Sequence, residues 1–154
     1  MNRGIVPLMC VAAAVLLAGC STSADRQGQS SPSSIPAEEL AHIRTCVDEL
    51  ARTSGQPTTV TAYPATTATL TQDLTLPITA VGSGEVYLVW MQGTFNDPYG
   101  SVTINGATQA APTFMWMAIP AGSPDAACPT GDVGFGSDAS NVDPTVLGPG
   151  IAVP

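Results

Sequence analysis

The segment that begins at Thr58 limits the fold most, because it consists of short runs of β-branched and aromatic residues separated by proline and glycine. Such runs favour strands over long helices. The run 85–92 is apolar at almost every position, which is typical of a central strand covered on both faces. A hairpin turn is expected at Asn105-Gly106, because both residues tolerate a positive φ. The expected strands are 58–63, 65–70, 85–92, 102–104, 113–119 and a last short one within 130–136.

One segment before these strands has the period of a helix. Pro36 suits its first turn, and Gly55 ends it. The sequence therefore predicts an α+β domain, with one N-terminal helix packed on a mostly antiparallel sheet of about four to six strands. His42 is off the apolar helix face and is expected to be solvated, and residues 144–154 are expected to form a loosely packed tail. The apolar face consists of Leu40, Ile43, Val47 and Leu50, at spacings of three and four.

The first nineteen residues have the pattern of an export signal. Arg3 supplies the positive charge, and sixteen uncharged residues with Pro7 among them separate it from Cys20. A membrane-spanning helix needs about 20 apolar residues, so this run is expected to be cleaved rather than to stay in the bilayer. Residues 1–19 are therefore assigned to a signal peptide. Residues 20–35, rich in serine and glutamine, are expected to form a flexible tether, and residues 36–154 a single domain.

The end of this signal, Leu17-Ala18-Gly19-Cys20, resembles the lipobox of bacterial lipoproteins. In that family a diacylglyceryl group is attached to the cysteine sulfur, and the chain is cleaved before the cysteine. The resemblance implies a mature protein that begins at lipidated Cys20 and is held at the extracytoplasmic side of the cell membrane. Two or more acyl chains, such as palmitate, give durable anchoring. A plain secretory signal is the other interpretation.

Two cysteines remain in the mature domain, because Cys10 leaves with the signal and Cys20 takes the lipid. In an oxidising compartment, Cys46 and Cys128 are expected to form a disulfide. Closing about 80 residues in this way contributes roughly 4–5 kcal/mol in the chain-entropy model. The alternative is a redox-active or metal-binding thiol pair, but the chain has neither a Cys-x-x-Cys motif nor a second histidine.

Charge limits the possible partners. The formal net charge is −8 and the chain has no lysine, which excludes a nucleic-acid-binding protein. From residue 53 to residue 154 there are seven acidic residues and no basic one. This acidity is interpreted as a solubility feature. The sharper hypothesis is a weak calcium site, because oxygen ligands suit hard cations and four such side chains cluster near the C-terminus: Asp132, Asp138, Asn141 and Asp143.

No catalytic residue, cofactor site or metal site is predicted beyond that calcium hypothesis. Gly82-Ser83-Gly84 lacks the spacing of a nucleophile elbow, and no helix follows the glycines of 131–136 to bind phosphate. The sulfur-rich and aromatic residues of the strands are interpreted as core packing rather than as a copper site. They are Trp90, Met91, Met115, Trp116 and Met117.

The strand 86–95 carries a second resemblance, together with Thr66-Thr67-Ala68 before it and the 130–133 turn and Leu147-Gly148 after it. These residues resemble small exported actinobacterial proteins of unknown function that are distantly similar to PepSY-type domains, although segment 122–128 lengthens the hairpin of that pattern. We expect a non-enzymatic envelope lipoprotein that binds another envelope component, such as a protein, peptide or glycan. The alternatives are an accessory subunit of an envelope hydrolase and a structural surface protein without a specific ligand. An exposed patch at Trp90, Tyr99 or Trp116 would favour a protein or glycan partner.

Overall fold

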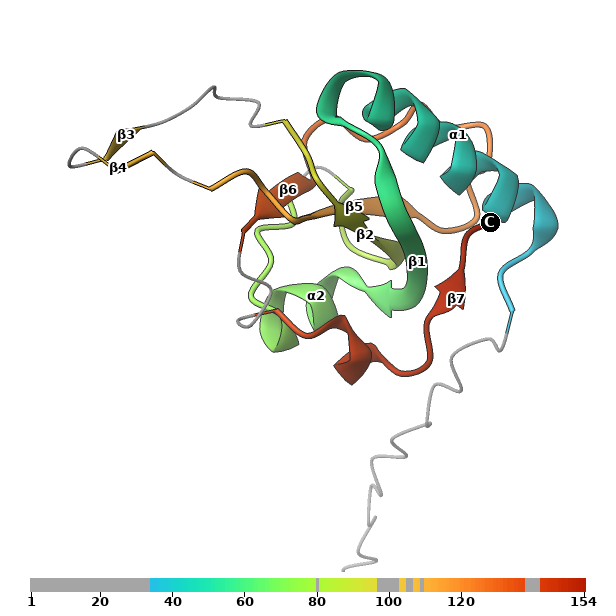
Figure 1. Ribbon diagram of the computed structural model, residues 1–154. Helices are drawn as coiled ribbons and strands as arrows, with labels where there is room; N and C mark the ends of the chain where they lie inside the picture. The colour runs from blue at the N-terminus through green and yellow to red at the C-terminus, as the bar shows by residue number, and fades with distance from the viewer. Residues whose placement is uncertain (1–33, 80, 97–102, 105–106, 109, 138–141) are drawn as a thin grey trace, which may run out of the picture.

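A computed structural model describes residues 34–79, 81–96, 103–104, 107–108, 110–137 and 142–154. The domain is an antiparallel five-stranded sheet with helical segments on both faces (Figure 1), which confirms the expected α+β class. The order of the strands across the sheet is β6-β5-β2-β1-β7. Their bounds are β1 Pro57–Thr66, β2 Glu85–Gly93, β5 Phe114–Pro120, β6 Val133–Gly136 and β7 Ile151–Ala152.

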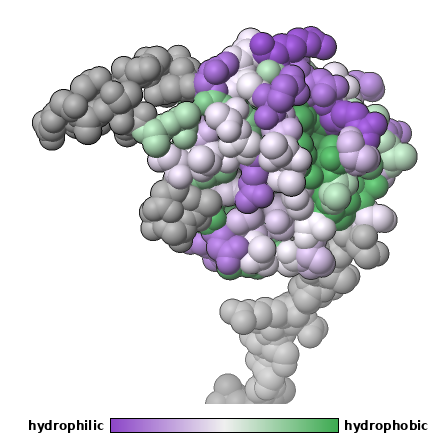
Figure 2. All heavy atoms as spheres, in the orientation of Figure 1, coloured by the Kyte–Doolittle hydropathy of each residue, from purple (hydrophilic) through white to green (hydrophobic). Residues whose placement is uncertain are grey.

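Helix α1 (Ala37–Ser54) packs on one face of this sheet. It begins directly after Pro36, which was expected in its first turn, and it is followed by Gly55, as predicted. Ile35 is also buried, and Leu40 packs in the same core cluster, so these two residues have the positions of a hydrophobic staple. Figure 2 shows hydrophilic residues along the rim where α1 lies and apolar residues gathered just below it, near the C-terminal end of the chain.

The two central strands, β2 and β5, are buried on both faces. All side chains from Val86 to Met91 and from Phe114 to Ile119 are at most 6% exposed. Successive side chains alternate between the two faces of the sheet. The methionines therefore pack beneath α1, whereas Trp90 and Trp116 pack in the opposite layer. Their interpretation as core residues is confirmed.

The threonine-rich segment after β1 departs from the prediction. Residues 65–70 do not form a second strand, because β1 continues to Thr66 and the chain then enters helix α2 (Thr67–Asp73). The hydroxyl oxygen of Thr66 accepts a hydrogen bond from the Thr69 N–H at 3.1 Å, and so caps this helix. Leu70 is fully buried in the layer opposite α1. Capping and burial together outweigh the strand preference of the threonines.

Pro64 lies inside β1 instead of ending a strand. β7 pairs only with Thr61 and Ala62, so the N–H that Pro64 lacks costs no hydrogen bond to that edge strand. On the other side, Pro64 keeps its register opposite Tyr87 of β2. A proline at this position is therefore compatible with a continuous strand.

Glycines of the edge strand β6 make room for two aromatic rings. Trp116 is the cross-strand partner of Gly134, and Phe114 is that of Gly136. A Cβ on Gly134 would lie 2.4 Å from Trp116 Nε1, and one on Gly136 would lie 2.4 Å from Phe114 Cζ. The Trp90 ring stacks on Phe114 with centroids 4.6 Å apart. The aromatic rings therefore cover the glycines of an edge strand.

A small hairpin and the C-terminal segment complete the structure. β3 (Thr103–Ile104) and β4 (Ala107–Thr108) pair with Ile104 opposite Ala107, as a two-residue connection requires, and they lie apart from the main sheet in Figure 1. The Asn105-Gly106 turn itself is outside the described residues.

The expectation of a loosely packed tail was wrong: residues Pro144–Leu147 form a 3-10 helix, η2, with Pro144 buried, and β7 pairs with β1.

Candidate functional site

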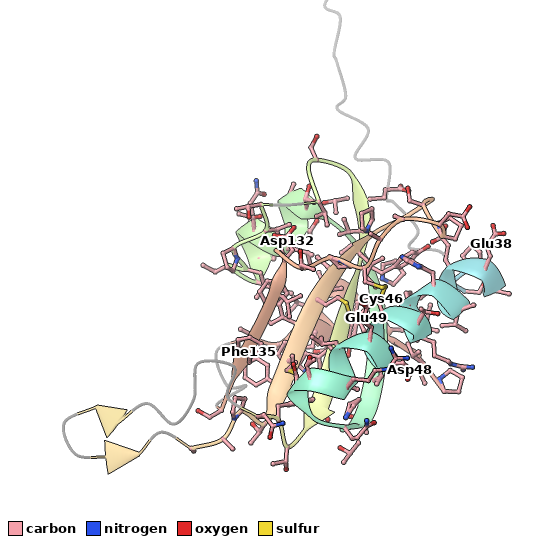
Figure 3. All side chains as sticks on the ribbon, turned by 90° about the horizontal axis from the view of Figure 1, so that it is seen from above. Glu38, Cys46, Asp48, Glu49, Asp132 and Phe135 are labelled. Carbon is pink, nitrogen blue, oxygen red and sulfur yellow. A yellow bond between two sulfur atoms is a disulfide. The ribbon has the colours of Figure 1, made fainter. Side chains whose placement is uncertain are left out.

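A disulfide joins Cys46 of α1 to Cys128, which lies between β5 and β6, and this confirms the predicted pairing. The two Cα atoms are 5.3 Å apart although the residues are 82 positions apart in the chain. We call residues 121–131 the strap, because the disulfide fastens this segment to α1. Figure 3 shows Cys46 on the helix, with its sulfur directed away from α1 toward a neighbouring segment of the same chain.

Few contacts hold the strap. Among the described residues, two hydrogen bonds join it to other elements, and both lie at its start: Ala121 N–H donates to Glu85 O, and Gly122 N–H donates to Glu39 Oε1, each at 3.0 Å. From 122 to 127 its residues are exposed, apart from one half-buried proline. The disulfide is therefore the main attachment of the middle of the strap.

A carboxylate and a phenol lie beside the start of the strap. Glu39 is in the first turn of α1, where a negative charge is favoured. Its Oε2 atom is buried without a hydrogen-bond partner in the part of the chain that the structure describes. Tyr87 of β2 is 6% exposed. Burial raises the pKa of the Tyr87 hydroxyl, and the neighbouring Glu39 carboxylate raises it further.

His42 lies against the disulfide. Its Nε2 atom is 3.7 Å from Cys46 Sγ, and the residue is half-buried rather than fully solvated. The separation of four residues between His42 and Cys46 was the signal in the sequence, because side chains at this spacing meet on a helix. Within the described ranges, no group of three or more histidine, cysteine or acidic side chains could hold a metal ion.

Of the four residues considered for calcium, the two that the structure describes have other roles. Asp132 is fully buried, and its carboxylate accepts the backbone N–H groups of Thr79 and Val81, each at 2.7 Å. Asp143 caps η2 by accepting the Thr145 N–H at 3.0 Å, and hydrogen bonds from Thr145 lower the pKa of Asp143. These two carboxylates are therefore used in holding loops. The other two residues, Asp138 and Asn141, lie outside the described residues.

The residues expected to form an exposed patch or to carry the lipid are either buried or outside the described residues. Trp90 and Trp116 are only 5% and 6% exposed, so neither forms an exposed patch. Tyr99 and the lipidation residue Cys20 lie outside the described residues.

No protein-family model matches the sequence, and no curated protein or solved structure matches it either. Among the helices that the structure describes, none has both the length and the hydropathy of a bilayer-spanning segment. The Cys46–Cys128 disulfide indicates an oxidising, extracytoplasmic environment.

Proposed function

We propose that this protein is a cell-envelope lipoprotein, anchored to the membrane through Cys20, whose domain binds another envelope component without catalysing a reaction. The disulfide is the observation that carries the proposal, because such bonds persist outside the reducing cytosol. The sequence Leu17-Ala18-Gly19-Cys20 supports the lipid anchor by its resemblance to a lipobox. Anchor and disulfide are consistent with the same compartment.

The polar contacts of the domain support binding rather than catalysis. Covalent or acid–base catalysis needs a nucleophile, a base and an orienting group within hydrogen-bond reach. His42 contacts a disulfide sulfur, and the carboxylates of Glu39 and Asp132 accept backbone N–H groups of loops. These contacts position loops and leave recognition to the outer surface.

The charge of that surface favours a partner with cationic or hydrogen-bond-donating groups. Glu38, Asp48 and Glu49 are exposed along α1 (Figure 3). Seven more acidic residues, of which Asp132 is buried, and no basic one follow from residue 53 to residue 154. We therefore propose a protein or peptide with a basic surface as the partner, because an anionic glycan or a phosphate-rich polymer would be repelled.

Cross-linking in intact cells, followed by affinity capture and mass spectrometry, tests the proposal. The wild-type chain should capture one basic envelope protein or peptide, and a variant with Glu38→Gln, Asp48→Asn and Glu49→Gln should lose it. The matched control changes Arg44 and Arg52 to Gln on the same helix and should retain the partner. Equal capture by both variants contradicts recognition through the acidic face. Capture of no specific partner would favour a structural surface protein.

A further inference from the structure

The two sulfur atoms that fasten the strap differ in their access to solvent. Cys46 is 1% exposed and belongs to the core beneath α1. Cys128 is half-buried in a segment whose preceding residues, 125–127, are all exposed. Cys128 packs only partly against the core, so it is the cysteine nearer to solvent, whereas Cys46 is shielded. Which sulfur is attacked, and how well the other sulfur leaves, set the rate of thiol–disulfide exchange.

The shielded sulfur is the one beside the histidine. His42 Nε2 lies 3.7 Å from Cys46 Sγ, on the same helix and one turn away. In its protonated form, an imidazole in this position stabilises a thiolate and can give it a proton. Attack on Cys128 would thus release Cys46 as the leaving group beside the imidazole of His42. The burial of Cys46 and its contact with His42 therefore favour Cys128 as the sulfur that is attacked and Cys46 as the sulfur that leaves.

We propose that Cys46–Cys128 is an exchangeable disulfide through which a dithiol reductant of the cell envelope releases the strap. A thiolate of the reductant forms a bond to Cys128 Sγ as the bond between the two protein sulfurs breaks. The electron pair of the broken bond stays on Cys46 Sγ, which takes a proton from the imidazolium form of His42, and the neutral imidazole that results regains a proton from solvent. The second thiol of the reductant then displaces Cys128, so the reductant leaves as a disulfide and both cysteines as thiols.

Release of the strap leaves the rest of the domain in place. Ile43, Val47 and Ala51 are buried in α1 and hold it on the sheet without the disulfide. Apart from the partial packing of Ala121 and Cys128 against the core, the strap keeps only its two hydrogen bonds at Ala121 and Gly122 among the described contacts. Opening exposes the Cys46 thiol, which is 1% exposed in the closed form. The proposal depends neither on the lipid anchor nor on the envelope partner, so its failure would leave the proposed function untouched.

The test uses the mature chain with Cys20→Ser, which leaves only Cys46 and Cys128 to alkylate. The protein is treated with dithiothreitol without denaturant, and samples are quenched with iodoacetamide at intervals. Intact-protein mass spectrometry then counts the alkyl groups. The parent chain should gain two alkyl groups, and His42→Gln should slow this reaction about tenfold. Thr45→Ala, an exposed neighbour on the same helix, is the matched control and should react at the parent rate. Equal rates for all three proteins would overturn the role of His42.

Hydrogen exchange on the reduced protein tests the release itself. Faster exchange should be confined to the strap, with α1 and β2 protected as in the oxidised protein. A chain with Cys128→Ser should give the same pattern without any reductant, which separates the opened state from effects of the reagent. Reduction that requires denaturant, or that speeds exchange throughout the sheet, would show a purely structural disulfide and overturn the proposal.

Discussion

The buried carboxylate of Asp132 accepts the backbone N–H of Val81 at 2.7 Å and so joins the turn before β6 to the loop before β2. The same carboxylate accepts the N–H of Thr79 at 2.7 Å. Backbone donors held in this way are costly to leave unpaired inside a protein. One aspartate thus fixes two connections that lie 51 to 53 positions apart in the chain.

Asp132→Ala should therefore lower the free energy of unfolding by about 2–4 kcal/mol, because it leaves two backbone donors without their acceptor in a buried place. Urea denaturation followed by tryptophan fluorescence measures the loss. Asp125→Ala, at an exposed position of the strap, is the control and should change stability by no more than about 0.5 kcal/mol. Similar losses for both variants would contradict the anchoring role of Asp132.

Gly134→Ala should destabilise the edge of the sheet, because the new Cβ would lie 2.4 Å from Trp116 Nε1. Overpacking of this kind costs about 1–3 kcal/mol. Thermal unfolding by circular dichroism should show a lower Tm, while Ser137→Ala, just beyond the end of β6, should leave it unchanged. A Gly134→Ala protein as stable as the parent would mean that the indole does not pack on this backbone.

Removing both disulfide cysteines by Cys46→Ala and Cys128→Ala should lower the free energy of unfolding by about 4 kcal/mol, since the disulfide closes a long loop of the unfolded chain. Urea titrations of the double variant, compared with the parent before and after reduction, measure this. The reduced parent and the double variant should unfold at similar urea concentrations. An unchanged midpoint in the double variant would argue against a stabilising disulfide.

Stability should fall as the pH rises above 10, because burial and Glu39 raise the pKa of Tyr87 above its ordinary value of 10.0 in the folded chain. The folded state then holds this proton more tightly than the unfolded state, so the contribution is complete below pH 10 and is lost above it. Unfolding free energies measured from pH 8 to pH 11 should show the decline. Tyr87→Phe should flatten it; an equally steep decline in that variant would assign the effect to other groups, such as Tyr63, whose pKa burial also raises.

The parts of the fold that the sequence predicted are those with a local signal. β2 and β5 have uninterrupted apolar runs, and α1 has a regular apolar face. The Cys46–Cys128 pairing was predicted by elimination, because the expected signal and the expected anchor would account for the other two cysteines. In each case a few neighbouring residues, or a simple count, are enough to decide.

The parts that were missed depend on contacts distant in the chain or on weak local preferences. β7 consists of Ile151 and Ala152, and it exists because β1 offers an edge about ninety positions earlier. Thr67–Asp73 has the composition of a strand, but the Thr66 cap and the burial of Leu70 make it a helix. The anchoring role of Asp132 was likewise invisible, since its partners are backbone groups of a distant loop.

The most direct test of the central claim is the intact mass of the native protein extracted from membranes, alkylated before and after reduction. An envelope lipoprotein with this disulfide should begin at Cys20, carry acyl chains, and gain two alkyl groups only once it has been reduced. An unlipidated chain in the membrane-free fraction would contradict the anchor, and two cysteines alkylated without a reductant in most molecules would contradict the oxidised, extracytoplasmic state of the domain.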